Sequence, residues 1–360
     1  MIFKKHIRYS GKADWPLLQR FFKETFHGKH ILANKIFFNW QFLPPFSKNK
    51  TPSVLILPAH RKILGCLGVI PVVMNYFGKK ISVSCLTNFR TDPLIRGKGS
   101  GVDFIEKATE GHDMSYTLQY VRDFDVLLKH SGWKTDIFLK RYVKILNYKK
   151  VSELAERKIP LSDYSSNQTR PHDNFTFSHA SEFDDRVDAL WRRLKYKYPI
   201  TIIRSREYLN WRYSKHPFFN YHLFFVRDGE KIQSFVVLRI EKFGSYTAGR
   251  IIDFISTDDA EVFTLKKLVE FCREHTVDFI DFFFTGDFHV PSLELCGFKE
   301  AHKKPYSLIP IRFDPIDRNI MTINLAYKIL NSKRVDRRIN QIDNWYVTKG
   351  DGDQDRPNPH

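Results

Sequence analysis

A short basic segment rich in glycine is the part of this sequence best suited to bind an anion. It reads Arg96-Gly-Lys-Gly-Ser-Gly101 and lies between an extended run, Ile81–Thr91, and an apolar helical pattern that begins at Val102. Glycines let backbone N–H groups converge on an oxyanion, and a helix start adds the positive end of its dipole. The pattern predicts a strand, a pyrophosphate-binding turn and a helix. It matches neither a Walker loop nor the dinucleotide-binding glycine fingerprint.

The same segment resembles the Arg/Gln-x-x-Gly-x-Gly/Ala signature of the GCN5-related N-acetyltransferase (GNAT) superfamily, with Arg96, Gly99 and Gly101 at the signature positions. The resemblance implies that the turn holds the pyrophosphate of acetyl-coenzyme A, or of another acyl-coenzyme A, as co-substrate. It also implies that the preceding strand, Leu86–Arg90, splays from its neighbour and offers unpaired amides to the thioester carbonyl. The cofactor-binding residues expected are Phe89, Arg90, Thr91, Arg96, Gly97, Lys98, Gly99, Ser100 and Gly101.

Acyl transfer to an amine needs a base for the amine and an acid for the leaving thiolate. Many GNAT enzymes carry a Glu on the strand before the turn, but this strand has none from Ile81 to Thr91. An amine that titrates near pH 8 needs only a weak base, so an imidazole or a carboxylate near the next strand, Met114–Val121, could serve. The family often has its acid, a Tyr, at the end of that strand. The expected catalytic residues are Tyr120, Asp123 and His130, with His112 and Tyr116 as further candidates.

The second half of the chain repeats the pattern of the first half. The segment Phe37–Phe42 corresponds to Tyr208–Tyr213, and a Gly-Trp pair ending at Trp133 corresponds to a Gly-Phe pair ending at Phe298. These correspondences keep a nearly constant spacing, which indicates two copies of one fold.

The glycine-rich turn is not repeated. In its place the second copy has Asp259–Thr264, which lacks glycine and carries two carboxylates. A pyrophosphate needs amides and cations rather than carboxylates, so we expect one cofactor site, in the first half.

The fold class expected is α/β (α+β), with two tandem GNAT-like domains that each have a mixed, mainly antiparallel sheet flanked by helices. The arrangement is similar to tandem GNAT proteins, which include Fem-type aminoacyltransferases and acyltransferases of bacterial surface-sugar pathways. We expect an acyl-coenzyme A-binding domain over residues 1–148, a linker over 149–174 and a degenerate second domain over 175–312. Residues 313–360 would form a C-terminal helix and an Asp-rich tail.

Two features are predicted for that last segment. Apolar and basic residues indicate a helix over Asn319–Gln341. The run that follows is similar to the Trp…Asp-x-Asp…Arg-Pro tail of some tandem GNAT proteins linked to surface polysaccharides. Two interpretations remain open: Asp351, Asp353 or Asp355 lies near the acceptor, or the tail is a solvated chain end. The twelve-residue loop of a calcium site, with its closing Glu, is missing.

Composition narrows the partners and the compartment. The 58 Lys and Arg exceed the 40 Asp and Glu and give a net charge of +18, which favours anionic ligands such as a phosphorylated cofactor. The four Cys form no CxxC pair, so we expect free thiols in a cytoplasmic protein and no metal site. No run of 18 apolar residues predicts a transmembrane segment, and a peripheral membrane contact is left open.

These observations predict an acyl-coenzyme A-dependent N-acyltransferase, with acetyl as the expected group. The expected acceptor is an amine on an amino sugar or sugar nucleotide of cell-envelope polysaccharide biosynthesis, and no nucleic acid is expected as partner. One alternative is a Fem-type transferase of peptidoglycan that takes an aminoacyl group from tRNA, although such an enzyme would not need the pyrophosphate turn. The other alternative is a non-catalytic GNAT-like binding protein.

Overall fold

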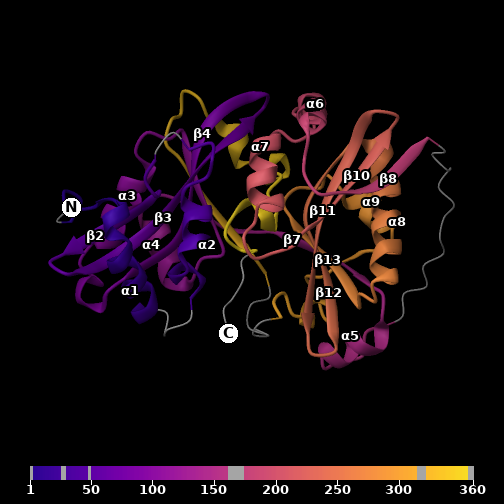
Figure 1. The fold of residues 1–360 in the computed structure, drawn as a ribbon, viewed down its shortest axis with the longest axis horizontal. Helices are drawn as coiled ribbons and strands as arrows, with labels where there is room; N and C mark the ends of the chain where they lie inside the picture. The colour runs from indigo at the N-terminus through magenta and orange to yellow at the C-terminus, as the bar shows by residue number, and fades with distance from the viewer. Residues whose placement is uncertain (1–2, 26–29, 48–49, 161–173, 314–321, 356–360) are drawn as a thin grey trace.

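The computed structural model describes residues 3–25, 30–47, 50–160, 174–313 and 322–355. Within these ranges the chain forms two lobes, each built on one β-sheet (Figure 1). Both sheets are mixed and mainly antiparallel, and helices flank them, so the predicted fold class is confirmed. Among the helices described, none is long and apolar enough to span a bilayer.

The first sheet has the strand order β1-β2-β3-β4-β5-β15-β6, and β9 pairs with β3 beside this path. Alternate residues of β2 face opposite sides: Ile56 packs with helices α1 and α2, whereas Leu55 packs with α3 and α4. These elements are β1 (Arg8–Tyr9), α1 (Trp15–Thr25), α2 (Lys35–Phe42), β2 (Val54–Ala59), β3 (Lys62–Tyr76), β4 (Lys79–Thr91), α3 (Ser100–Thr109), β5 (Met114–Leu118), α4 (Arg122–His130), β6 (Lys134–Phe138), β9 (Ile200–Ile202) and β15 (Asn324–Ile329).

The second sheet has the order β8-β10-β11-β12-β13-β7-β14. Each strand in this order corresponds to the strand at the same position in the first sheet. The parallel pair β4–β5 therefore corresponds to the parallel pair β12–β13. The elements of this lobe are β7 (Lys140–Ile145), α5 (Tyr148–Leu154), β8 (Phe175–Ala180), α6 (Asp185–Leu194), α7 (Arg206–Leu209), β10 (His222–Asp228), β11 (Lys231–Phe243), β12 (Tyr246–Ser256), α8 (Asp258–Glu274), β13 (Phe279–Phe284), α9 (Val290–Leu295) and β14 (Lys299–Glu300).

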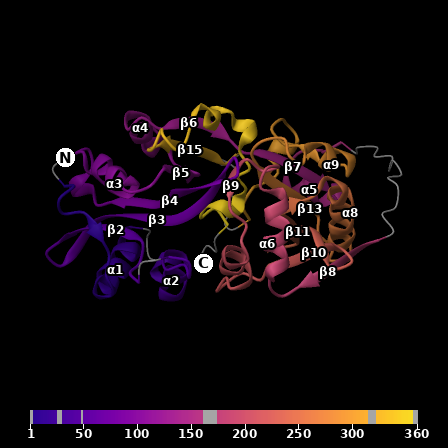
Figure 2. The same ribbon diagram turned by 90° about the horizontal axis from the view of Figure 1, so that it is seen from above.

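Besides β9 in the first sheet, each sheet contains one strand from the other half of the chain. Strand β7 lies between β13 and β14, among the orange strands of Figure 1. In return, β15 lies between β5 and β6, as the yellow strand beside them in Figure 2 shows. Each sheet thus includes a strand from beyond the expected domain limits at residues 148 and 312. The division of the chain at these limits stays a prediction.

Two predicted elements need correction. The sequence pattern over Ile137–Ile145 predicts one strand. The structure has two strands there, because the chain leaves one sheet after Phe138 and enters the other at Lys140. The helix expected over Asn319–Gln341 is wrong where it is described, since Asn324–Ile329 is strand β15 and the rest is turns and short 3-10 helix. A short apolar run is compatible with either structure, and the open edges of β5 and β6 supply main-chain partners that decide for the strand.

A pair of tryptophans joins the two lobes. Trp40 of α2 stacks on Trp211 with ring centroids 5.4 Å apart and an interplanar angle of 23°. Each indole Nε1–H donates to the backbone carbonyl of the other residue, at 2.8 Å and 2.7 Å. The reciprocal contact is what two equivalent residues make across a local two-fold axis. The corresponding Trp positions of the two predicted copies therefore lie face to face.

Replacing Trp40 by Ala should lower the free energy of unfolding by about 3 kcal/mol, because it removes the stacked ring and leaves the carbonyl of Trp211 without its donor. Urea unfolding followed by circular dichroism would measure the loss. Ile36→Ala is the control in the same helix, since that side chain is 66% exposed and should change stability by less than about 0.5 kcal/mol. Equal losses in the two variants would contradict the role given to the Trp pair.

Candidate active site

The two parallel strands of the first sheet separate at one end and leave a cavity between them. Strands β4 and β5 pair as far as Leu86 and Thr117, where the Thr117 hydroxyl donates to the Leu86 carbonyl at 2.9 Å. Beyond this point β4 bulges, with Asn88 at φ 54°, and β5 ends where Gln119 takes φ 51°. The gap has a volume of about 680 Å³. The structure thus contains the splay that the family resemblance implies.

The glycine-rich turn forms one wall of this cavity. Gly97 and Gly99 have φ of 73° and 80°, and a Cβ on either would meet no atom within 4 Å. Helix α3 begins directly afterwards at Ser100, so its first amides have no carbonyl partner within the helix. Position 101 requires glycine for a different reason, because a Cβ there would come within 2.5 Å of Leu127 of α4. The turn therefore offers open amides, and α3 packs closely on α4.

The cavity brings together most of the predicted cofactor residues. Lys98 belongs to the same turn but is exposed and lies outside the cavity wall. Phe89 stacks on Phe124 of α4, with ring centroids 5.2 Å apart, and so gives the cavity an aromatic side. The predicted residues in its wall are Phe89, Arg90, Thr91, Arg96, Gly97, Gly99, Ser100 and Gly101.

The predicted catalytic residues do not all meet. Tyr120 and Asp123 line the cavity, whereas His130 is an exposed residue at the far end of α4, outside the wall. His112 lies just before β5, at the end of that strand away from the gap, where Ser82 Oγ is 2.9 Å from its Nδ1. The structure thus leaves Tyr120 and Asp123 as the candidates within reach of a ligand.

The two candidate tyrosines differ in their surroundings. Tyr116 is fully buried, and its hydroxyl donates to the carbonyl of Asp351. Tyr120 is half-buried at the cavity, and its backbone is clamped by Asn324 of β15, which accepts from the Tyr120 amide at 2.8 Å. Burial raises the pKa of Tyr120 to about 12. Its phenol therefore stays protonated at neutral pH, and it donates to the Leu325 carbonyl of β15 at 3.5 Å.

Another wall of the cavity comes largely from the C-terminal segment, residues 342–355, which runs between the lobes (Figures 1 and 2). Asp353, Gln354 and Arg312 line the cavity. Gln354 Nε2 donates to the carbonyl of Leu118 at 3.2 Å and to Asp353 Oδ1 at 2.7 Å, while Arg312 donates to Gln354 Oε1 at 2.8 Å. Of these residues, the sequence pointed only to Asp353, as one of three aspartates. Arg312 and Gln354 carried no recognisable signal.

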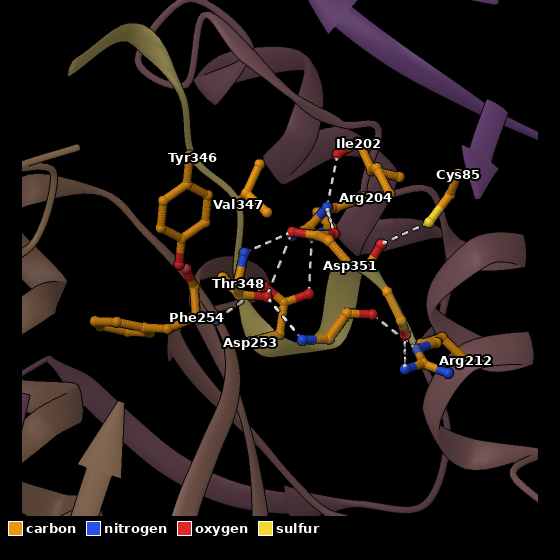
Figure 3. Close-up of polar contacts among 12 residues, drawn as sticks. Cys85, Ile202, Arg204, Arg212, Asp253, Phe254, Tyr346, Val347, Thr348 and Asp351 are labelled. Carbon is orange, nitrogen blue, oxygen red and sulfur yellow. Dashed lines mark hydrogen bonds and ion pairs between the residues drawn. The ribbon is translucent and has the colours of Figure 1, made fainter. Parts of the chain in front are cut away.

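Buried ion pairs hold the segment on both sides of Asp353. Arg204 lies between Asp253, at 2.8 Å, and Asp351, at 2.9 Å, as Figure 3 shows. Asp355 accepts from Arg239 at 2.7 Å. All of these side chains are buried. The interpretation of residues 351–355 as a solvated chain end is therefore wrong.

The same segment fills the corresponding gap of the second sheet. Thr285, just after β13, donates its amide to the carbonyl of Val347 at 3.0 Å, and Phe284 is bridged to Thr348. The Tyr346 hydroxyl donates to the Phe254 carbonyl on β12. At the start of α8, the carboxylate of Glu261 lies 2.6 Å from Lys197. A protein side chain thus occupies the region where α3 offers amides in the first lobe.

Solved structures with the same fold include three acyltransferases or probable acyltransferases. A GCN5-related N-acetyltransferase from Anabaena variabilis ATCC 29413 has a TM-score of 0.58 and 10% identity, over 90% of this chain and 72% of that chain. A probable N-acyltransferase from Enterococcus faecalis V583 has a TM-score of 0.60 and 13% identity, over 90% and 72%. The Saccharomyces cerevisiae N-myristoyltransferase with bound myristoyl-CoA has 0.51 and 12%, over 90% and 79%.

These likenesses show that the chain has the fold of GCN5-related N-acetyltransferases. No protein-family model and no curated protein matches the sequence.

The ion pairs next to the C-terminal segment predict that the stability of the fold falls in acid. Glu241 lies 2.9 Å from Arg250 and 3.4 Å from Arg239, the residue that holds Asp355. Burial raises the pKa of Glu241, but the two guanidinium groups outweigh burial and lower it from 4.5 to about 2. The carboxylate therefore stabilises the fold above about pH 4.5, and this contribution is lost as the pH falls towards 2.

Glu241→Gln should lower the free energy of unfolding at pH 7 by about 3 kcal/mol, and the difference from wild type should shrink as the pH falls from 4.5 towards 2. Urea unfolding at a series of pH values would measure both. Glu230→Gln, at a side chain that is 96% exposed, should differ little from wild type at every pH. A Glu241→Gln deficit that stays constant with pH would mean that packing, not charge, was lost.

Proposed function

We propose that this protein transfers an acyl group from an acyl-coenzyme A to an amine. The observation that carries the proposal is the cavity between β4 and β5, which joins the glycine-rich turn to the carboxylate- and amide-bearing C-terminal segment. Its volume of about 680 Å³ is in the range of small-molecule sites. The fold of N-acyltransferases supports the same activity.

The glycine-rich turn would bind the pyrophosphate of coenzyme A. Gly97 and Gly99 leave space beside their backbone, α3 directs its first amides towards that space, and Arg96 adds a positive charge. The pantetheine arm would then follow β4 past Phe89, where the bulge turns backbone groups away from β3. The corresponding region of the second lobe holds Glu261 and Lys197, which supports a single cofactor site.

The reaction would proceed by direct attack. The amine nitrogen forms a bond to the thioester carbonyl carbon, the C–S bond breaks, and coenzyme A leaves as the thiolate. Amides of β4 would hold the carbonyl oxygen as negative charge develops on it. The nitrogen loses one proton to a base, and the thiolate gains one. Tyr120 is the acid that we propose for the thiolate, because it lines the cavity and carries a phenol that is protonated at neutral pH.

For the acceptor we propose an amino sugar or a sugar nucleotide used in cell-envelope polysaccharide synthesis. Asp353 and Gln354 offer carboxylate and amide groups to hydroxyls and an amine, while Arg312 and the net charge of +18 favour a substrate that carries phosphate. An acetyl group is the simplest donor. The four described Cys are buried free thiols, which suits the reducing cytoplasm. Transfer from aminoacyl-tRNA would leave the pyrophosphate turn without a ligand.

Gly99→Glu should abolish the rise in melting temperature that coenzyme A produces in the wild type, because the new carboxylate would project into the space beside the turn. Differential scanning fluorimetry with coenzyme A would measure the shift. Gly111→Glu is a matched control: Gly111 also has φ of 80° and open space around it, but it lies after the other end of α3. If both variants respond as the wild type does, the cofactor assignment is wrong.

Incubation of the protein with acetyl-coenzyme A and a panel of amino-sugar nucleotides should release free thiol in proportion to one acylated sugar. A thiol-reactive dye and mass spectrometry would follow thiol and product. Thiol release with peptides or simple amines, and none with sugars, would exclude the proposed acceptor while keeping the acyltransferase. A coenzyme A-induced shift without turnover on any amine would favour a binding protein.

A further inference from the structure

We propose that Asp353 is the residue that binds the acceptor's amino group and accepts the proton that it loses. The inference rests on the proposed acyltransferase function and extends it to the base, for which β4 offers no Glu. Three observations support it: how the neighbouring aspartates are used, how Asp353 is held, and where it lies relative to the gap between the strands.

The C-terminal segment carries three buried aspartates, which differ in where they lie relative to the cavity. Asp351 is paired with Arg204, whose Nη1 and Nη2 lie 2.8 Å and 2.9 Å from its two oxygens. Asp355 accepts from Arg239 at one oxygen and from Tyr221 at the other, at 2.6 Å. These two carboxylates fix the chain. Asp353 alone among the three lies in the wall of the cavity.

Asp353 is held at a defined place. The residue before it, Gly352, packs on the end of β5 so closely that a Cβ there would come within 2.9 Å of Leu118. Arg212 donates to the Gly352 carbonyl at 2.6 Å. The residue after it, Gln354, donates to Asp353 itself and to the Leu118 carbonyl. Asp353, a residue with 8% exposure, is thus fixed beside the last residue of β5.

This location suits a carboxylate that binds the amine as it attacks the thioester. The thioester would lie in the gap that opens after Leu86 and Thr117, and Leu118 is the next residue of β5. The other carboxylate in the wall, Asp123, is exposed on α4, whose residues Phe124 and Leu127 pack on Phe89 and Gly101. Asp123 therefore belongs to the part of the wall that surrounds the cofactor, whereas Asp353 belongs to the part built by β5 and the C-terminal segment.

In the step that we assign to it, Asp353 first accepts a hydrogen bond from the amino group. As the C–N bond forms and the C–S bond breaks, the nitrogen transfers one proton to the carboxylate, and the electron pair of the C–S bond leaves with sulfur. The protonated carboxyl then returns its proton to water. Gln354 keeps Asp353 oriented throughout by its hydrogen bond to Oδ1.

The test compares Asp353→Asn with wild type in the assay of thiol release, using the acceptor found active in the panel. Asn keeps the shape and can accept the hydrogen bond of Gln354, so the coenzyme A-induced melting shift and the KM for acetyl-coenzyme A should stay unchanged. The kcat should fall by about 100-fold or more, the usual contribution of a general base. Asp353→Glu should recover part of the loss. The control is Asp343→Asn, at an exposed aspartate earlier in the same segment.

Activity of Asp353→Asn within about threefold of wild type would overturn the inference, as would an equal loss in Asp353→Asn and Asp353→Glu together with loss of the coenzyme A shift. The same conclusion follows if Asp123→Asn, and not Asp353→Asn, shows the 100-fold loss expected of a base. A wild type that releases no thiol with any amine would instead overturn the proposed function on which the inference depends.

Discussion

The fold depends on a guanidinium group buried between carboxylates from distant parts of the chain. Arg204 is fully buried and contacts Asp253 of β12 and Asp351 of the C-terminal segment. Removing Arg204 would leave two buried carboxylates without their cation, in a medium where an uncompensated ion costs several kcal/mol. The pairing therefore fixes the C-terminal segment against the second sheet. From there the segment reaches the first sheet, where Cys85 contacts the Asp351 carbonyl, as Figure 3 shows. The Tyr116 hydroxyl donates to the same carbonyl.

This anchor explains why two similar lobes have different interiors. The strand order is the same in both, yet residues 345–348 fill the space after β13 while residues 352–354 only line the space after β5. One segment thus closes one gap and shapes the other. Arg212 links it to the Trp pair, since its guanidinium lies over the Trp40 ring at 5.3 Å and donates to Gly350 and Gly352. The lobe contact and the cavity wall are parts of one connected structure.

The sequence was most informative where local chemistry decides the structure. Glycine spacing located the turn at Arg96–Gly101, and the repeated Asn-Trp segments indicated two copies, because both patterns involve neighbouring residues. It failed for β15 and for the break between β6 and β7, because the identity of a sheet partner more than a hundred residues away leaves no local pattern. The role of Arg312 and Gln354 escaped for the same reason. His130 was chosen for its side chain, but its position at the end of α4 directs it away from the cavity.

The exchange of β7 and β15 also constrains the order in which the protein can be completed. Strand β15 supplies Asn324, whose side chain clamps the backbone of Tyr120, and it separates β5 from β6. During translation the first sheet must wait for almost the entire chain before its interior strand arrives. A ribosome-bound chain that ends before residue 324 has therefore not assembled the pocket, although every glycine of the turn has long been synthesised.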